Sequence, residues 1–335
     1  MTAVAEETGA AASSTPTAPP GERRREVVTY VAYLAAERVI NALPRGLILA
    51  LADAAGNAAH DLASEKRRVV RENLARPLGL PPTHRRVRRA ARRAFRNYAK
   101  YLVDMMRLSG PRDEELGELV TIDNLEILRE AQVGAKGVLL CTVHVGGMDL
   151  LAPALHREGE QLHVVADDTT YGRLYEHLRA IRARYGILLI GWRSLRALFR
   201  ALRGGGNLVL FCDGGYRPGD VPVEFLGEAT TFPAGPATLS ARSGAPILPV
   251  ACSRLPDERF RTRGLPLIRA ADDSPAEIYR ATQALADALA SVIAEDPGQW
   301  YMFRPVWPQT DAERAQAAAA LASARRGEDW SARSA

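Results

Sequence analysis

The stretch VLLCTVHVGGMDLLA, residues 138–152, decides the fold class of this chain. Its first half, VLLCTVHV, is a short apolar run of the kind that forms a fully buried strand. Gly146 and Gly147 then permit a tight turn, and from Met148 onward the apolar residues have helical spacing. A strand, a glycine turn and a helix in this order predict a strand–helix–strand crossover unit.

The same alternation continues along the chain. Helical stretches closed by glycines, at Gly186, Gly204 and Gly244, separate further apolar runs. The runs that predict strands are LHVVAD (162–167), ILLIG (187–191), NLVLFCD (207–213) and PILPVACSR (246–254). Strands that alternate with helices predict an α/β fold, with a mixed, mainly parallel sheet flanked by helices.

A helical segment precedes this part of the chain. Apolar residues recur at three- and four-residue spacing in VVTYVAYLAAERVINAL (27–43) and in LILALADAAGNAAHDLA (47–63). Charged residues interrupt both runs before they reach the length that spans a bilayer. Any contact with a membrane is therefore predicted to be peripheral.

These patterns predict one main domain with a segment on either side. Residues 1–24 read as a disordered tail, residues 25–308 as the domain, and residues 309–335 as a C-terminal helix or tail. Within the domain, residues 25–108 form an N-terminal helical arm and residues 119–308 form the α/β core.

The charge balance is mildly basic. The chain has 44 Lys and Arg against 39 Asp and Glu, a formal net charge of +5, and a pI near 9.3. The helix predicted over residues 82–108 concentrates this charge in Arg85, Arg86, Arg88, Arg89, Arg92, Arg93 and Arg96. We expect this helix to dock on an anionic lipid surface; the alternative is a solvated helix face. No nucleic-acid motif accompanies the charge, so nucleic-acid binding is not expected.

The cysteines give no sign of a metal or a disulfide framework. Cys141, Cys212 and Cys252 are an odd number, are widely spaced and lack the spacing of metal ligands. We interpret them as buried free thiols, consistent with a reducing cytoplasm.

His144 falls at the carboxyl end of the first predicted strand, the edge at which open α/β sheets bind ligands. Asp149 lies five residues further on, in the first turn of the next helix. Across a strand-to-helix turn the two side chains can meet. A carboxylate that accepts from one imidazole nitrogen leaves the other nitrogen free to act as a base. The alternative is a buried histidine satisfied by the backbone beside an ordinary capping aspartate.

HVGGMD (144–149) matches an H-x-x-x-x-D motif, and with it the chain resembles the bacterial lipid A acyltransferases and their branch that acylates mycobacterial phosphatidylinositol mannosides. The resemblance covers about residues 25–308. It is carried by RVVRENLARPLG (68–79), VLLCTVHVGGMDLLA (138–152), the stretch from LRALFR to PVACSR (195–254) and QWYMFRPVW (299–307). One departure stands out: the branch usually has Asn-Trp where this chain has Gly147-Met148.

The resemblance implies direct transfer of a fatty acyl chain from a thioester to a hydroxyl of a membrane lipid or glycolipid, of the lipid A or phosphatidylinositol mannoside type. His144 is the expected general base and Asp149 the carboxylate that orients it. The chain has no G-x-S-x-G motif, which argues against a serine hydrolase of the α/β-hydrolase type.

Further residues are expected to bind the substrates. Backbone N–H groups near Gly146 and Gly147 are candidate donors to the tetrahedral oxyanion, and a nearby arginine is another. Arg182, in preference to Arg184, is expected near a phosphate of the donor or acceptor; the alternative is that both solvate a helix. Asp213, the second acidic position of the family, is expected to line the site or to bind the acceptor head group; the alternative is an aspartate that opens a glycine-rich turn. Glu224 is a further candidate for contact with a polar head group.

The expected donor is acyl-CoA or an acyl-acyl carrier protein, with no cofactor and no metal. The expected location is the cytoplasmic face of the inner membrane. Three alternatives stay open: a lysophospholipid acyltransferase with a glycerol acceptor, a non-catalytic lipid-binding homologue, and a hydrolase that passes the acyl group to water. The sequence does not fix the acceptor, the acyl length or the oligomeric state.

Overall fold

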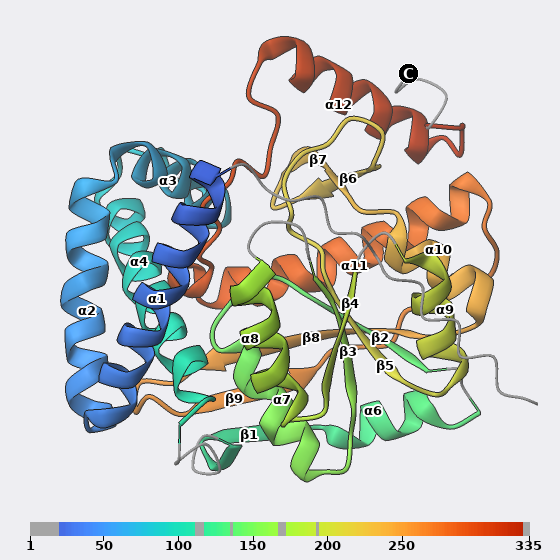
Figure 1. Ribbon diagram of the computed structural model, residues 1–335. Helices are drawn as coiled ribbons and strands as arrows, with labels where there is room; N and C mark the ends of the chain where they lie inside the picture. The colour runs from blue at the N-terminus through green and yellow to red at the C-terminus, as the bar shows by residue number, and fades with distance from the viewer. Residues whose placement is uncertain (1–19, 111–116, 135–136, 167–171, 192–193, 331–335) are drawn as a thin grey trace, which may run out of the picture.

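The computed structural model describes residues 20–110, 117–134, 137–166, 172–191 and 194–330 (Figure 1). Its strands are β1 (Val120–Asp123), β2 (Val138–Thr142), β3 (Leu162–Ala166), β4 (Ile187–Gly191), β5 (Asn207–Phe211), β6 (Val221–Phe225), β7 (Glu228–Phe232), β8 (Ile247–Arg254) and β9 (Phe260–Gly264). Its helices are α1 (Pro20–Ala42), α2 (Arg45–Leu62), α3 (Ser64–Leu78), α4 (Arg85–Arg107), α6 (Leu125–Gln132), α7 (Met148–Arg157), α8 (Gly172–Ala183), α9 (Leu195–Arg203), α10 (Gly235–Ser243), α11 (Pro275–Glu295), the 3₁₀ turn η1 (Pro297–Gln299) and α12 (Asp311–Arg325).

In the described part of the chain, one seven-stranded sheet has the order β1-β9-β8-β2-β5-β3-β4. From β8 to β4 the strands run parallel to one another, whereas β9 pairs antiparallel with β8, and β1 runs parallel to β9. The predicted α/β fold with a mixed, mainly parallel sheet is confirmed. The sequence analysis missed β9, because its FRTRG sequence places arginines among its apolar positions and lacks a continuous apolar run.

The centre of the sheet is buried between two layers of helices. All five residues of β2 are buried, and alternate side chains face opposite layers. Val138 and Leu140 pack in a core formed with α6, α7 and α8. Leu139 and Cys141 pack in a second core, formed with α3, α4, α9, α10 and α11. This burial on both faces explains why the run that set the fold is almost continuously apolar.

Helices α1 to α4 form a layer at one end of the molecule (Figure 1). Gly56 lets α2 approach α4 closely, since an added Cβ would lie 2.6 Å from the Cα of Arg96. The predicted tail, residues 1–24, needs correction in part: α1 already begins at Pro20, and residues 1–19 lie outside the described residues. No helix among the residues that the structure describes is long and apolar enough to cross a membrane.

Two elements complete the fold on the C-terminal side. β6 and β7 form a separate antiparallel hairpin, whose turn places Leu226 (φ 51°) and Gly227 (φ 85°) in the left-handed region. The helix predicted after residue 309 is observed as α12, which begins with a capping box between Thr310 and Glu313. α12 packs on the hairpin, so the hairpin is covered by the end of the chain.

Candidate active site

The site lies at the carboxyl edge of the two central strands. β2 and β5 pair in parallel with Thr142 opposite Phe211. His144 and Asp213 each follow the last residue of their strand by two positions. Because the two strands end at the same level, the loops after them lie side by side. The fold therefore brings together a histidine and an aspartate that are far apart in sequence.

Asp213 holds His144 with both carboxylate oxygens. The imidazole Nδ1 lies 2.7 Å from Oδ1 of Asp213, and Oδ2 accepts from the backbone N–H of His144 and the indole N–H of Trp300, both at 2.9 Å. The Asp213 side chain is completely buried. Since a carboxylate only accepts, Nδ1 carries the proton in the neutral imidazole, and the lone pair is at Nε2.

The protonation equilibria of the pair shift in opposite directions. Burial by itself lowers the pKa of His144, but the negative charge of Asp213 and its hydrogen bond outweigh this and raise the pKa above its ordinary value. Burial by itself raises the pKa of Asp213, but the charge and hydrogen bonds of His144, together with Trp300, lower it below its ordinary value. The ionised Asp213 therefore stabilises the protonated imidazole.

The other side of the imidazole is open. The ring packs against Phe211 with centroids 4.5 Å apart, and 42% of the side chain remains exposed. None of the described residues hydrogen bonds to Nε2. His144 thus presents a free basic nitrogen to solvent while its Nδ1 is held from within the core.

Asp149 opens α7, but it does not orient His144 as the motif had led us to expect. Its Oδ1 accepts from Nε and Nη2 of Arg182 at 3.1 and 2.9 Å, and its Oδ2 accepts from the hydroxyl of Tyr101. The reason for this correction is geometric: β5 delivers Asp213 to the imidazole, while the start of α7 directs Asp149 toward α8 and α4. Its charge still raises the pKa of His144, to a smaller extent than that of Asp213.

The glycine turn is held by neighbouring backbone. Gly146 N–H donates to the Gln299 carbonyl at 3.4 Å, and Gly147 N–H donates to the Cys252 carbonyl at 3.2 Å. A Cβ at Gly146, where φ is 61°, would overlap that same Cys252 carbonyl oxygen. The expectation that these two N–H groups bind the oxyanion is therefore not met, because protein carbonyls already occupy them.

A glycine is needed at position 147 for a different steric reason. A Cβ at this position would overlap the ring of Phe260, which comes from β9. Phe260 is fully buried, and the guanidinium of Arg254 lies 4.5 Å from its ring centroid. The glycine at position 147 thus has a local packing cause: an aromatic ring fills the volume next to it.

The other predicted site residues differ in whether they lie near His144. Arg182 reaches the site through Asp149, and only 19% of its side chain is exposed. Asp213 lines the site, which is one of its two expected positions, and bonds directly to His144. Glu224 is on the β6–β7 hairpin, where its carboxylate pairs with Arg325 of α12 at 2.5 Å. The structure does not bring Glu224 together with His144.

The sequence analysis missed two aromatic contributors. Trp300 and Tyr101 are hydrogen-bond donors to the two site carboxylates. Trp300 lies in QWYMFRPVW, a block that carries the family resemblance, so the signal for it was present. Tyr101 lies on the arginine-rich helix. Its spacing there is that of an aromatic residue facing the core, so the sequence carries no signal for a role in the site.

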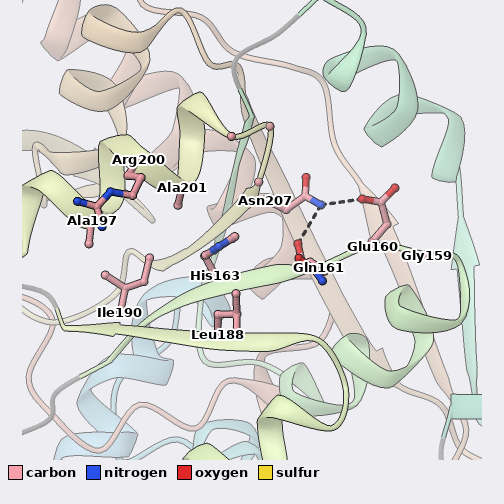
Figure 2. A pocket seen from close by; sticks show the side chains of 13 residues that line it. Gly159, Glu160, Gln161, His163, Leu188, Ile190, Ala197, Arg200, Ala201 and Asn207 are labelled. Atoms are coloured by element: carbon pink, nitrogen blue, oxygen red, sulfur yellow. Dashed lines mark hydrogen bonds between the residues drawn. The ribbon is translucent and has the colours of Figure 1, made fainter. Parts of the chain in front are cut away.

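A cavity of about 640 Å³ lies apart from this site (Figure 2). It lies at the amino ends of β3 and β5, where Asn207 donates to Glu160 at 2.7 Å, and extends along β4 past Leu188 and Ile190. Neither His144 nor Asp213 lines it. The reaction centre is therefore assigned to the opposite edge of the sheet, on chemistry rather than on cavity size.

The structure also bears on metal and thiol chemistry. Within the described ranges, no group of three or more His, Cys, Asp or Glu side chains converges in a way that could hold a metal ion. The three cysteines are buried free thiols, as predicted.

Comparison with known proteins identifies the family of this chain. The model of the family described as bacterial lipid A biosynthesis acyltransferase matches residues 19–309. The chain is similar to the phosphatidylinositol mannoside acyltransferase of Mycolicibacterium smegmatis, with 29% identity over 286 residues, which cover 84% of this chain and 91% of that protein. It is likewise similar to the protein of the same name from Mycobacterium tuberculosis H37Rv, with 29% identity over 247 residues, covering 71% and 76%. Because the family match spans most of the sequence, the chain belongs to the bacterial lipid A biosynthesis acyltransferase family and is an acyltransferase of lipid biosynthesis.

Proposed function

We propose that this enzyme transfers a fatty acyl chain from an acyl thioester to a hydroxyl of a membrane glycolipid, with an acceptor of the phosphatidylinositol mannoside type. The observation that carries the proposal is the open Nε2 of His144 on an imidazole held by the buried carboxylate of Asp213. The names of the two mycobacterial relatives support the acceptor class. Acyl-CoA and acyl carrier protein both fit as thioester donors.

The chemistry follows from the state of the imidazole. Nε2 of His144 takes the proton of the acceptor hydroxyl as its oxygen bonds to the thioester carbonyl carbon. Asp213 stabilises the imidazolium that forms and keeps the ring in place. The tetrahedral intermediate then collapses: the carbon–sulfur bond breaks, and the proton on Nε2 passes to the departing thiolate. No covalent acyl-enzyme is required.

A buried hydroxyl on the helical arm suits a hydroxyl-rich acceptor. The hydroxyl of Tyr33, on α1, is buried and has no hydrogen-bond partner in the described part of the chain. The charges of Arg182 and Asp149 both act on the pKa of Tyr33, which burial raises above its ordinary value, so Tyr33 lies near this pair. An unsatisfied buried hydroxyl is costly, and a sugar hydroxyl in this position would satisfy it.

We further propose that the helical arm docks the enzyme on the inner membrane. Large apolar side chains on α1 and α2 face solvent, among them Val28 (61% exposed), Val31 (57%) and Leu62 (84%). The exposed arginines at the start of α4 that have no ion pair among the described residues are Arg85, Arg86, Arg88 and Arg89. Apolar residues beside unpaired cations suit a surface of anionic lipid.

The arm also lies next to the site. His177 of α8 contacts Glu37 of α1 at 3.1 Å, and α8 carries Arg182. A membrane bound to α1 would therefore present its lipid head groups close to the reaction centre.

The test of the transfer reaction is direct. Purified protein receives radiolabelled palmitoyl-CoA and the total lipids of the source organism, beside His144→Ala and His156→Ala variants. His156 is exposed on the helix that follows the site, so it is a matched control. The expected result is a labelled glycolipid that appears with wild type and His156→Ala and is absent with His144→Ala.

Other outcomes identify the competing functions. A labelled phospholipid would replace the glycolipid acceptor with a glycerol acceptor. Label only as free fatty acid would identify a hydrolase. If neither palmitoyl-CoA nor palmitoyl-acyl carrier protein is consumed, the lipid-binding homologue is favoured.

Docking is tested separately by cosedimentation with vesicles. Phosphatidylglycerol vesicles should retain the protein at low salt, and phosphatidylcholine vesicles should retain much less, because salt screens exposed charges. Val31→Ser and Arg88→Gln should each weaken retention without loss of transfer to a detergent-dispersed acceptor. Equal binding to both vesicle types would contradict the electrostatic part of the proposal.

A further inference from the structure

The segment that closes the domain, Gln299–Trp307, crosses both loops of the site. At its start, the Tyr301 N–H donates to the His144 carbonyl at 3.2 Å. Further along, the Pro305 carbonyl approaches Gly215, two residues after Asp213, where a Cβ would lie 2.8 Å from its oxygen. Arg304 therefore lies on the stretch of backbone that joins the His144 loop to the Asp213 loop.

A buried amide fixes this stretch of backbone. Nδ2 of Asn73, on α3, donates to the carbonyls of Met302 at 3.0 Å and Arg304 at 2.8 Å, and its Oδ1 accepts from Val306 N–H at 3.4 Å. Asn73 is only 3% exposed. It belongs to the RVVRENLARPLG block, whose part in the site the sequence did not reveal. Three hydrogen bonds from one side chain give the backbone at Arg304 a defined position.

The charge of Arg304 is uncompensated. Its side chain is exposed, and no described carboxylate pairs with it, whereas Arg182 is neutralised by Asp149. The cation nevertheless lowers the pKa of His144. Its effect on this pKa is smaller than the effects of burial and of Asp213, and larger than that of Asp149. Arg304 thus carries an unpaired positive charge on the backbone segment that contacts both loops of the site.

The site needs such a group. The N–H groups of Val145, Gly146 and Gly147 all donate to protein carbonyls, so the glycine turn cannot bind an oxyanion. We propose that the guanidinium of Arg304 is the donor that stabilises the oxyanion of the tetrahedral intermediate, and that Asn73 positions it. The inference rests on the acyl transfer proposed above.

The step balances without another group. As the acceptor oxygen bonds to the carbonyl carbon and its proton moves to Nε2 of His144, the carbonyl π electrons move to the oxygen, which accepts from Arg304 N–H groups. When the carbonyl re-forms, the carbon–sulfur bond breaks and the thiolate receives the proton from Nε2. Arg304 exchanges no proton in either direction.

The experiment measures release of the thiol from palmitoyl-CoA with lipid acceptor and with water alone, for wild type, Arg304→Gln, Arg304→Lys and the control Arg203→Gln. Arg203 is exposed on α9 and has no ion pair among the described residues. Acyl transfer to water and acyl transfer to a lipid both form a tetrahedral oxyanion. Thioester turnover therefore tests Arg304 even if the proposed acceptor is wrong. Arg304→Gln should lower kcat by roughly 10² with little change in KM, since loss of an oxyanion donor costs about that factor. Arg304→Lys should retain part of the rate, and Arg203→Gln all of it.

The pH profile adds a second readout. Removal of the Arg304 charge raises the pKa of His144, so the acidic limb of kcat/KM should move to higher pH in Arg304→Gln. Asn73→Ala should slow wild type but add little to Arg304→Gln, because it acts through the same side chain. An unchanged kcat in Arg304→Gln would overturn the inference. An increase in KM without a change in kcat would also overturn it, because it would show that Arg304 only binds a substrate phosphate.

Discussion

Asp213 and Asp149 lie at the same edge of the sheet and have different partners. Asp213 is completely buried and is satisfied by an imidazole, a backbone N–H and an indole N–H. Asp149 is 15% exposed and is satisfied by Arg182 and Tyr101. One carboxylate bonds directly to the base, while the other is neutralised by a permanent cation.

The difference shows that the partner decides what a carboxylate does. A titrating partner such as His144 couples the charge of Asp213 to the protonation of the imidazole. A guanidinium keeps its charge at every accessible pH, and the pairing of Arg182 with Asp149 joins α8 to the start of α7. The motif spacing identifies Asp149, but the hydrogen bonds assign the orienting role to Asp213.

The largest effect is expected for Asp213→Asn. An amide can present an N–H to Nδ1 and so favours the wrong tautomer of His144, and it cannot stabilise the imidazolium. We expect kcat/KM to fall on the order of 10³-fold. Steady-state kinetics at saturating donor measures this, with circular dichroism to confirm that the buried variant is folded. Near-normal turnover in a folded Asp213→Asn protein would return the orienting role to Asp149.

A smaller loss is expected for Asp149→Asn. The change leaves Arg182 without its carboxylate, which should cost on the order of 2 kcal/mol of unfolding free energy, less than for a fully buried pair because both side chains retain some exposure. Turnover should fall about tenfold, since His144 and Asp213 remain paired. Denaturant unfolding of Asp149→Asn, Arg182→Gln and the double variant forms the control. If the two losses of stability simply add, the ion pair is not the cause.

The pH dependence sharpens the same comparison. His144 must be neutral to accept a proton, and Asp213 raises its pKa, so activity should rise with pH with a midpoint above the ordinary histidine value of about 6.5. In Asp213→Asn the residual activity should show a lower midpoint, because the stabilising charge is gone. Asp149→Asn should also lower the midpoint, but by a smaller amount than Asp213→Asn. A larger shift in Asp149→Asn than in Asp213→Asn would reverse the assignment.

The smallest effect is expected for Glu224→Gln. This carboxylate pairs with Arg325, and both side chains are about half exposed, so the change should alter stability by less than about 1 kcal/mol. Acyl transfer should keep the wild-type rate, which a parallel assay with Asp149→Asn would show. A marked increase in the KM for the lipid acceptor would instead place Glu224 in the acceptor site.

The fold was predictable because its signals are local. Apolar runs such as VLLCTVHV and glycine-closed helices specify the parallel strands and their crossovers. The edge strand β1, and β9, which lies between β1 and β8, were missed because neither has a continuous apolar run and each is defined by its neighbours in the sheet.

The site was predictable only in part. His144 follows from its place after a buried strand, and the family resemblance identified Asp213 as an acidic position of the site. The pairing of the two depends on the register between β2 and β5, which no local pattern encodes. The contacts of Trp300 and Tyr101 likewise depend on segments that meet only in the folded chain.

The ring of Phe260 against Gly147 limits how this sequence can change. A side chain at position 147 would place its Cβ 2.3 Å from a carbon of that ring, so the ring would have to move. Introducing Asn-Trp at positions 147 and 148 would therefore need a compensating change at Phe260, on β9 and outside the motif itself.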